Sequence, residues 1–505
     1  MIELTAAEIA AITGGKAMGG TAGGAADAAS VSVTSVTTDS REVRPGSLFV
    51  AKPGEQSDGH LYVPGAFDAG AALALTEREV RDEAGRLLPQ VVVPDSVLAM
   101  GAVAAEVVAR LRAGSGLEVV GITGSAGKTT TKDLLAGILA QVAPTVAPVG
   151  SYNGEVGVPL TVFNADYSTR YLVCEMGATG IGHIEYLAKL VQPDVGVVLG
   201  VGTAHAGEFG GVENIARAKG ELVEALAPAG TAVLNADDSR VRAMAARTSA
   251  SILYFTAGED FTPGDDGGRS QVLRARGVRT TTEGHPEFTL RFPDGAEEHI
   301  VSGLIGSHHV ANLLAAAAAA WVLGIDPGTI AAGLNGRGPA SRWRMERTER
   351  PDGVTVINDA YNANPESMRA ALRTLAELGQ GRRTWAVLGE MLELGDASVQ
   401  EHDALGRIAV RLNISRLIVV GAGAKAMHNA AVLEGSWGDE SMYVDTPDEA
   451  FNVLQEQLRP GDLVLFKSSN GAGLRLLGDR IAAAATAEAA AADSAEQNTG
   501  KGERR

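Results

Sequence analysis

The chain has 505 residues, and 43 Lys and Arg against 61 Asp and Glu give it a formal charge of −18. A hydrophobic fraction of 45% and a charged fraction of 21% exclude wholesale disorder, and the length predicts about three domains. The acidic excess argues against nucleic acid or an anionic membrane as the main partner, because both attract positive fields. The single cysteine, Cys174, excludes an internal disulfide framework. The N-terminus lacks the pattern of a signal peptide and no apolar run reaches about 18–20 residues, so we expect a cytoplasmic protein without a membrane-inserted segment.

Residues 1–113 are predicted to form an N-terminal domain. A short apolar run at 47–51 lies among turn-rich pieces, and residues 96–111 carry apolar side chains at helical spacing. The Gly- and Ser-bearing stretch 112–116 that follows is expected to be a hinge.

Residues 114–336 are predicted to form a central domain built on a parallel sheet. Apolar strand-like runs at 117–122, 171–176, 195–201 and 231–234 alternate with helical or loop segments such as 130–139. Residues 261–300 alternate polar and apolar side chains around turns, which predicts antiparallel strands added to that sheet. The Ala-dense helix expected over 308–323 then packs against it.

Residues 337–484 are predicted to form a C-terminal, Rossmann-like doubly wound domain. Its strand-like runs lie at 354–358, 384–388, 417–420, 442–444 and 463–466, with helix-like segments between them. Residues 485–505 turn Ala-rich and then polar, which predicts a disordered tail. The expected fold is therefore α/β in three domains.

The stretch from Gly121 to Thr130 (GITGSAGKTT) lies between a predicted strand and a predicted helix, which points backbone N–H groups at an anion. Lys128 is expected to neutralise the β- and γ-phosphates of ATP, and the Thr129 hydroxyl to bind Mg²⁺. The spacing departs from the usual Walker pattern, because Gly124 lies three positions before Gly127 and Ile122 occupies the usual glycine place. A Gly-rich turn with a surface lysine is the alternative, and the register of strand, loop and helix argues against it. The predicted ATP-binding loop is Gly124, Ser125, Ala126, Gly127, Lys128, Thr129 and Thr130. The central domain is therefore expected to be a P-loop ATPase domain.

Two further side chains are expected at the carboxyl edge of the same sheet. Glu175 ends one predicted strand, and His205 follows another shortly after its end. Ligands collect at this edge of a doubly wound sheet, so both are expected to converge on Thr129 and hold a divalent ion. A solvated strand end and a loop histidine are the alternatives. Lys219 reads as an ordinary helix-surface lysine on these grounds, and Cys174 as a small core residue.

Several motifs together resemble the Mur ligase family. The shortened P-loop spacing, Tyr152-Asn153 with Gly157-Val-Pro159, and the Gly306–Asn312 segment all resemble it, and the likeness runs from Thr38 to Asn470. Asp359-Ala-Tyr-Asn-Ala-Asn-Pro365 resembles the branch that adds D-alanyl-D-alanine. The resemblance implies a monomeric, ATP-dependent amide ligase of peptidoglycan precursor synthesis. Its substrates are UDP-MurNAc-tripeptide and D-Ala-D-Ala, and the reaction passes through an acyl phosphate.

The resemblance also implies roles for residues around the P-loop. Glu175 and His205 resemble metal ligands, and Lys219 resembles a lysine that is carbamylated and meets a second Mg²⁺. Lys128, Lys219 and His205 are thus the expected catalytic residues. Asn312, Arg342, Asp359 and Tyr361 resemble nucleotide contacts. His309 and Gly154 stand where the family has asparagines.

On the substrate side, the resemblance implies contacts from Asn153, from Asn362 and Asn364 to the acceptor, and from Ser40 and Arg41 to the uridine nucleotide. The two asparagines before Pro365 can instead form a turn and a helix cap. Arg41 can equally be a surface arginine.

Two other functions are alternatives to this hypothesis. Another Mur ligase or a folylpolyglutamate-type ligase would add a single amino acid, and the motif 359–365 argues against it. A nucleotide-gated binding protein would bind ATP without forming an amide, and it gives no reason for a second α/β domain that carries Asn362 and Asn364. Hinges at 112–116 and 335–338 would let the ligase close over its acyl phosphate and exclude water.

Overall fold

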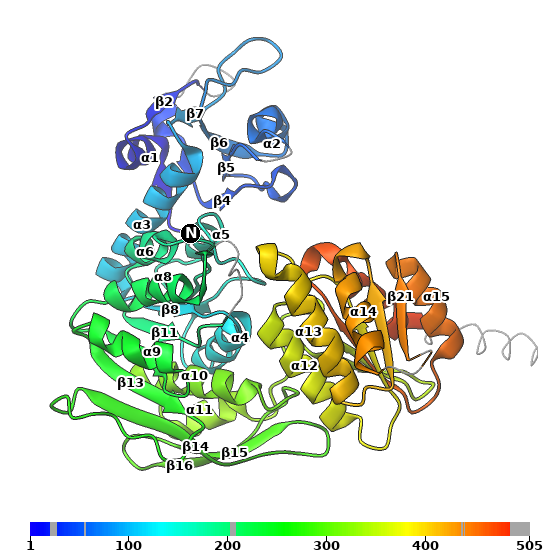
Figure 1. Cartoon of the computed structure of the whole chain (residues 1–505). Helices are drawn as coiled ribbons and strands as arrows, with labels where there is room; N and C mark the ends of the chain where they lie inside the picture. Colours follow the sequence, from blue (N-terminus) through cyan, green and yellow to red (C-terminus); the bar gives the residue numbers. More distant parts are fainter. Residues whose placement is uncertain (21–27, 55–56, 203–208, 436–437, 439, 485–505) are drawn as a thin grey trace, which may run out of the picture.

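The computed structural model describes residues 1–20, 28–54, 57–202, 209–435, 438 and 440–484. The predicted tail and His205 lie outside these residues. Figure 1 shows an α/β chain in three bodies, with the N-terminal part above the central sheet and the C-terminal part beside it. Within the described residues no helix is both long and apolar enough to cross a membrane.

The N-terminal part is a small α/β unit. Its five-stranded sheet has the order β2-β7-β6-β5-β4, and its strands are parallel except for the β2–β7 pair. The strands are β2 (Lys16–Met18), β4 (Ser35–Thr37), β5 (Ser47–Val50), β6 (Ala71–Thr76) and β7 (Gln90–Val92). A second pair joins β1 (Leu4–Thr5) to β3 (Ser32–Val33), and the helices are α1 (Ala6–Thr13) and α2 (Val63–Asp68).

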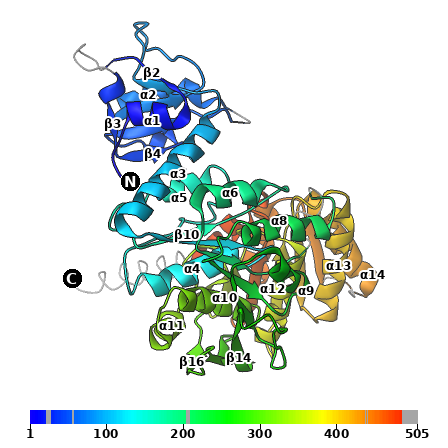
Figure 2. The ribbon, with the colours of Figure 1, turned by 90° about the vertical axis from the view of Figure 1, so that its left-hand side faces the viewer.

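Helix α3 (Ser96–Ser115) runs without a break from the N-terminal part into the central part (Figure 2). It begins where the Asp95 carboxylate accepts two backbone N–H groups, and it ends at Gly116, whose φ of +66° suits only glycine well. Arg112 pairs with Asp194 at 2.9 Å. The expectation of a hinge over 112–116 is therefore wrong for 112–115, which form the last helical turn, and the chain changes direction only at Gly116.

The central part is built on a nine-stranded sheet with the order β16-β15-β14-β13-β12-β11-β8-β10-β9. The strands are β8 (Glu118–Thr123), β9 (Thr145–Val146), β10 (Tyr171–Glu175), β11 (Val195–Val198), β12 (Thr231–Asn235), β13 (Ser251–Thr256), β14 (Ser270–Thr280), β15 (Pro286–Arg291) and β16 (Glu297–Val301). Strands β8 to β14 pair in parallel. Strands β14, β15 and β16 pair antiparallel, which confirms the predicted edge strands.

Helices cover both faces of this sheet. One face packs against α4 (Lys128–Leu139), α10 (His309–Val322) and α11 (Pro327–Leu334), and the alanines of α10 are buried there as predicted. The other face packs against α3, α5 (Gly157–Val162), α6 (His183–Val191), α8 (Val212–Glu224) and α9 (Ser239–Ala243). Cys174 lies in this second core, and burial raises the pKa of its thiol to about 12.

The C-terminal part holds a six-stranded sheet with the order β17-β18-β22-β19-β20-β21. The strands are β17 (Glu346–Glu349), β18 (Thr355–Asn358), β19 (Thr384–Leu388), β20 (Arg416–Val420), β21 (Ser441–Val444) and β22 (Leu463–Lys467). Helices α12 (Pro365–Leu378), α13 (Ser398–Arg411) and α14 (Lys425–Glu434) cover one face, and α15 (Pro447–Gln457) and helical residues 474–484 cover the other. The five parallel strands match the predicted runs, whereas the antiparallel edge strand β17 was not predicted.

Candidate active site

A cavity of about 870 Å³ lies where the central and C-terminal parts meet. The P-loop and the carboxyl end of β10 line it from the central part, and Arg344, the 359–364 loop and Lys467 line it from the C-terminal part. It therefore lies at the carboxyl edge of the central sheet, where doubly wound folds bind ligands.

The P-loop surrounds the start of α4. Gly124 and Gly127 have φ of +156° and +82°, and the Lys128 ammonium donates to the Gly124 carbonyl at 2.8 Å. Burial lowers the pKa of Lys128, while the Glu175 carboxylate acts in the opposite direction. The loop thus presents an ammonium and the free N–H groups of a helix start to the cavity, which suits an anion such as a phosphate.

Replacing Gly127 by alanine is expected to weaken nucleotide binding at least about tenfold, because the site must distort. A Cβ at this position would lie 2.2 Å from the Asn312 amide oxygen, on a backbone whose φ of +82° disfavours any side chain. Calorimetric titration with ADP measures the effect. Gly65→Ala is the control, since its φ is not in the left-handed region and no atom lies within 4 Å of the added Cβ. Equal ADP affinity in the two variants would contradict the expectation.

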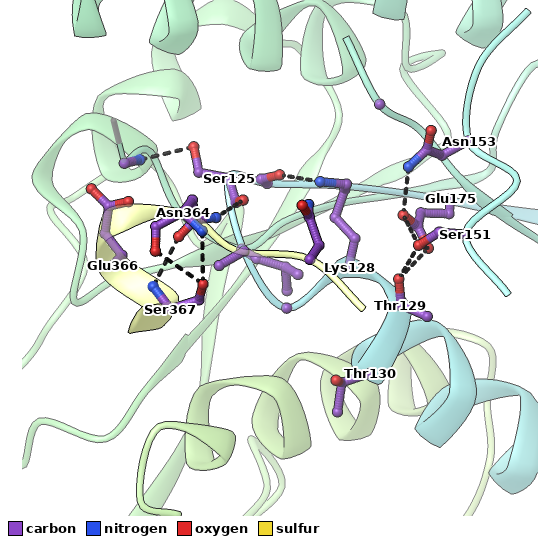
Figure 3. A pocket seen from close by; sticks show the side chains of 18 of the residues that line it. Ser125, Lys128, Thr129, Thr130, Ser151, Asn153, Glu175, Asn364, Glu366 and Ser367 are labelled. Carbon is purple, nitrogen blue, oxygen red and sulfur yellow. Dashed lines mark hydrogen bonds between the residues drawn. The ribbon is translucent and has the colours of Figure 1, made fainter. Parts of the chain in front are cut away.

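Oxygen ligands gather beside the P-loop. The Thr129 hydroxyl donates to Glu175 Oε2 at 2.9 Å, and the Ser151 hydroxyl lies 2.5 Å from that of Thr129 (Figure 3). The Asn153 amide donates to Glu175 Oε1 at 2.8 Å, so it orients the carboxylate. Two hydroxyls and a carboxylate form the hard oxygen set that Mg²⁺ prefers, and the residues present fit this ion. Ser151 was not predicted, and its only signal was its place beside Tyr152-Asn153.

Lys219 lies in α8 and is only 5% exposed, so the expectation of a helix-surface lysine is wrong. It lines the cavity, and burial together with the nearby Lys128 charge lowers the pKa of its amine to about 7. Its helix packs the apolar side chains of Ile215 and Leu222 inward, and Lys219 follows Ile215 by one helical turn. That spacing was a signal for burial.

The segment before α10 lies against the P-loop. The buried Asn312 donates from its amide to His309 Nδ1 at 3.1 Å, and its amide oxygen faces Gly127. The rings of His308 and His309 are 4.1 Å apart, and burial lowers the pKa of both, that of His308 to about 4. Both imidazoles are therefore neutral near pH 7.

The arginine that sequence reasoning selected lies outside this cavity. Arg342 has a side chain that is 60% exposed and pairs with Asp479 at 3.0 Å. Arg344, two residues later, lines the cavity instead, and its Nη2 donates to Thr129 at 3.2 Å and to Ser151 at 3.3 Å. Sequence reasoning missed it because an arginine in a polar segment reads as exposed.

Asp359 and Tyr361 both line the cavity from the C-terminal part. The Asp359 carboxylate accepts from Lys467 at 2.6 Å and from the backbone N–H of Met345 at 3.1 Å. The guanidinium of Arg344 lies over the Tyr361 ring, 4.4 Å from its centroid. Asp359 thus fastens two neighbouring segments of the C-terminal part, and Tyr361 supports an arginine.

Asn362 and Asn364 also line the cavity, and both have backbone roles. Asn364 caps α12 in a capping box with Ser367, and its amide donates to the Ser125 carbonyl at 3.2 Å across the domain boundary. The Asn362 carboxamide oxygen accepts from the Ala363 N–H at 2.9 Å. The turn and cap considered as an alternative are therefore present.

Ser40 and Arg41 do not line the cavity. They lie in a short 3-10 turn of the N-terminal part, where the Asp39 carboxylate accepts from the Arg41 backbone and side chain at 2.9 Å. The Arg41 side chain is 86% exposed. These two residues therefore mark a separate surface.

Comparison with known proteins gives a consistent result along nearly the whole chain. Residues 32–110 match the Mur ligase family catalytic domain, residues 122–320 the Mur ligase middle domain, and residues 343–470 the Mur ligase glutamate ligase domain. The UDP-N-acetylmuramoyl-tripeptide–D-alanyl-D-alanine ligase of Mycobacterium tuberculosis is 45% identical over 96% of this chain and 98% of its own.

Solved structures agree with these sequence matches. MurF from Acinetobacter baumannii has a TM-score of 0.81 and 31% identity, covering 95% of this chain and 99% of that one. MurF ligase from Thermotoga maritima in complex with ADP has a TM-score of 0.72 and 28% identity, covering 88% and 96%. The chain belongs to the Mur ligase family.

Proposed function

We propose that this chain is an ATP-dependent ligase that joins D-alanyl-D-alanine to UDP-N-acetylmuramoyl-tripeptide, giving the pentapeptide precursor, ADP and phosphate. The observation that carries the proposal is that the P-loop and the 359–364 loop line the same cavity. Relatives named for this activity match nearly the whole chain. The proposed enzyme works in peptidoglycan precursor synthesis, in the cytoplasm and as a monomer.

The chemistry requires two anions to react. The terminal carboxylate oxygen of the peptide bonds to the γ-phosphorus as the bond from phosphorus to the β–γ bridging oxygen breaks, and the electron pair leaves on ADP. The amine of D-Ala-D-Ala then attacks the acyl carbon and loses a proton, and phosphate leaves with the electron pair of the broken C–O bond. Charge repulsion opposes the first step, so positive groups near the γ-phosphate are the main need of the site.

The P-loop side of the cavity meets that need. Lys128 is proposed to bind the β- and γ-phosphate oxygens, and the backbone N–H groups from Ala126 to Thr130 to cradle the phosphate chain. Asn312, Asp359 and Tyr361 are proposed to complete the nucleotide site. Arg342 would reach the nucleotide only after its ion pair with Asp479 breaks.

Mur ligases use ATP and Mg²⁺, and the oxygen ligands beside the P-loop suit that ion. Thr129 and Glu175 would hold one Mg²⁺, and His205 with a carbamylated Lys219 would hold a second. Bound there, the ions would supply positive charge to the phosphate oxygens. A neutral Lys219 amine, which its lowered pKa of about 7 provides above that pH, is the form that reacts with CO₂.

The three parts of the chain have distinct proposed roles. Residues 1–113, with Ser40 and Arg41, are proposed to bind the uridine nucleotide end of the precursor. Residues 114–336 bind ATP, with Asn153 near the peptide carboxylate. Residues 337–484 bind D-Ala-D-Ala through Asn362 and Asn364.

An acceptor screen tests the proposed function. The full chain is incubated with ATP, Mg²⁺ and UDP-MurNAc-tripeptide, together with D-Ala-D-Ala or with single amino acids. Phosphate release and a mass increase of one dipeptide are expected only with D-Ala-D-Ala. Release with a single amino acid alone would favour another amino-acid ligase, and nucleotide binding without any amide product would favour a nucleotide-gated binding protein.

Asn364→Ala is expected to weaken the acceptor site as well as the helix. Loss of the cap is expected to cost about 1 kcal/mol of stability. Loss of the proposed hydrogen bond from the Asn364 amide to the dipeptide is expected to raise the KM for D-Ala-D-Ala by up to about tenfold. Thr446→Ala is the matched control, because Thr446 caps α15 in the same way before a proline. Denaturant unfolding and steady-state kinetics separate the two effects. If the KM for D-Ala-D-Ala is unchanged in Asn364→Ala, Asn364 caps the helix and does not bind the acceptor.

A further inference from the structure

The loop of residues 389–394 lies at the same edge of the C-terminal sheet as the 359–364 loop. It follows β19 directly, and β19 pairs in parallel with β22, which pairs in parallel with β18 on its other side. The loops after these three strands therefore meet at one carboxyl edge, where ligands of doubly wound sheets bind. The 359–364 loop, which follows β18, lines the cavity.

Hydrogen bonds join these loops through the end of β22. The Lys467 ammonium donates to the Asn362 carbonyl at 3.1 Å, and the Lys467 carbonyl accepts from the Gly389 N–H at 3.0 Å. Ser469, two residues later, donates its N–H to the Glu390 carbonyl at 2.9 Å. The 389–394 loop is therefore fixed relative to a residue that is proposed to bind the acceptor.

A buried histidine holds the same loop from α13. His402 is fully buried, its Nε2 accepts from the Met391 N–H at 2.9 Å, and its Nδ1 lies 2.7 Å from the Ser398 carbonyl oxygen. Because a carbonyl only accepts, Nδ1 carries the proton and Nε2 does not. Burial lowers the pKa of His402, so the neutral form that both bonds need is the one present near pH 7.

Glu393 has a strained backbone within this loop. Its φ is +66°, in the left-handed region that residues other than glycine disfavour. Strain of this kind persists where surrounding contacts enforce it, and it concentrates at functional sites. Glu393 lines the cavity, so the enforced conformation places a carboxylate at the substrate cavity.

Among the described residues, three carboxylic acids line the cavity from the C-terminal part. Asp359 pairs with Lys467 at 2.6 Å. Glu366 lies against the central part, because a Cβ added to Gly202 would lie 2.8 Å from the Glu366 carboxyl carbon. Glu393 is the third, and it is exposed. It is therefore the acid at this end of the cavity that is best placed to meet a cation on a substrate.

We propose that Glu393 binds the ammonium group of D-Ala-D-Ala and accepts the proton that this nitrogen must lose before it attacks the acyl phosphate. The inference rests on the proposed function. An α-amino group is mostly protonated at pH 7, so the acceptor needs both a negative charge beside it and a base. The Glu393 carboxylate takes the first proton, and the nitrogen lone pair then forms the C–N bond. The second proton leaves with the phosphate, which takes the electron pair of the broken C–O bond.

The test uses full-length Glu393→Gln and Glu393→Gly, with Asp396→Asn as the control. Glycine adopts the left-handed conformation without strain, so Glu393→Gly removes the carboxylate and should still unfold at or near the wild-type temperature. In both variants we expect kcat/KM for D-Ala-D-Ala to fall at least about 100-fold. Asp396 is an exposed acid three residues later that does not line the cavity, so its variant should keep wild-type kinetics.

Two further measurements separate contact with the acceptor from a structural role. Positional isotope exchange in bridge-labelled ATP, with the tripeptide substrate and no dipeptide, reports the first step alone and should stay within about threefold of wild type in both variants. Added formate should restore part of the activity of Glu393→Gly, because a small carboxylate can enter the space of the missing side chain. Formate should not raise the activity of wild type or Asp396→Asn.

Two results would overturn the inference. One is a kcat/KM for D-Ala-D-Ala within about threefold of wild type in either Glu393 variant. The other is an isotope exchange rate that falls as much as ligation does, since Glu393 would then act on phosphoryl transfer or on the fold of the site. Wild-type protein that fails to ligate D-Ala-D-Ala would instead contradict the proposed function.

Discussion

Lys128→Ala is expected to lower kcat by about a thousandfold or more, because it removes the charge that offsets repulsion between the γ-phosphate and the carboxylate. The ammonium lies at the start of α4 and donates to the Gly124 carbonyl at 2.8 Å, so it is already positioned on the loop that would hold the phosphates. Phosphate release and product formation by mass spectrometry measure the loss. ADP binding should weaken as well, since Lys128 is also proposed to bind the β-phosphate.

Lys189→Ala is the control for this variant. Lys189 is an α6 lysine with a side chain that is 71% exposed, and it pairs with Glu185 on the same helix. It should keep wild-type activity, and thermal unfolding should show both variants folded. Full ligase activity in Lys128→Ala would refute the P-loop assignment.

Lys219→Ala is expected to lower kcat by about 100-fold or more, with partial recovery when short-chain carboxylic acids are added, because a carboxylate then replaces the carbamate. The pH dependence has a definite sign. Only the neutral amine reacts with CO₂, and a pKa of about 7 makes Lys219 mostly neutral at pH 8 and mostly protonated at pH 6. Bicarbonate should therefore reactivate CO₂-depleted wild-type protein at pH 8 and much less at pH 6.

Arg217→Ala, on the exposed side of the same helix, is the control for Lys219→Ala. It should respond neither to carboxylic acids nor to bicarbonate. A fully active Lys219→Ala, or a reduced activity that no carboxylic acid restores at any pH, would remove carbamylation from the proposal.

Most of the fold followed from the sequence because strands buried on both faces must be apolar along their whole length. The runs that became β8, β10 and β11 are of this kind and lie in the middle of the sheet. Strand β17 was missed because it lies at a sheet edge, and its mostly charged residues show no apolar run. Sequence patterns report burial, so they identify central strands better than edges.

The site was predictable where chemistry and local structure coincide, and less so where the tertiary fold decides. Glu175 was found because it ends an apolar strand beside the P-loop strand. Arg344, Ser151 and the burial of Lys219 depend on how separate elements approach one another, and a single sequence does not display that approach. The burial of Lys219 had one local signal: it follows the apolar Ile215 by four residues, on the same face of the helix.

Helix α3 has a consequence for substrate choice. Its 20 residues span about 30 Å, and it joins the N-terminal sheet to the central one with no flexible residue before Gly116. The pairing of Arg112 with Asp194 fastens its far end to the central domain. If the uridine nucleotide is anchored in the N-terminal domain, this rigid connection acts as a molecular ruler. A peptide that is one residue too short or too long would then present its carboxylate out of line with the γ-phosphate.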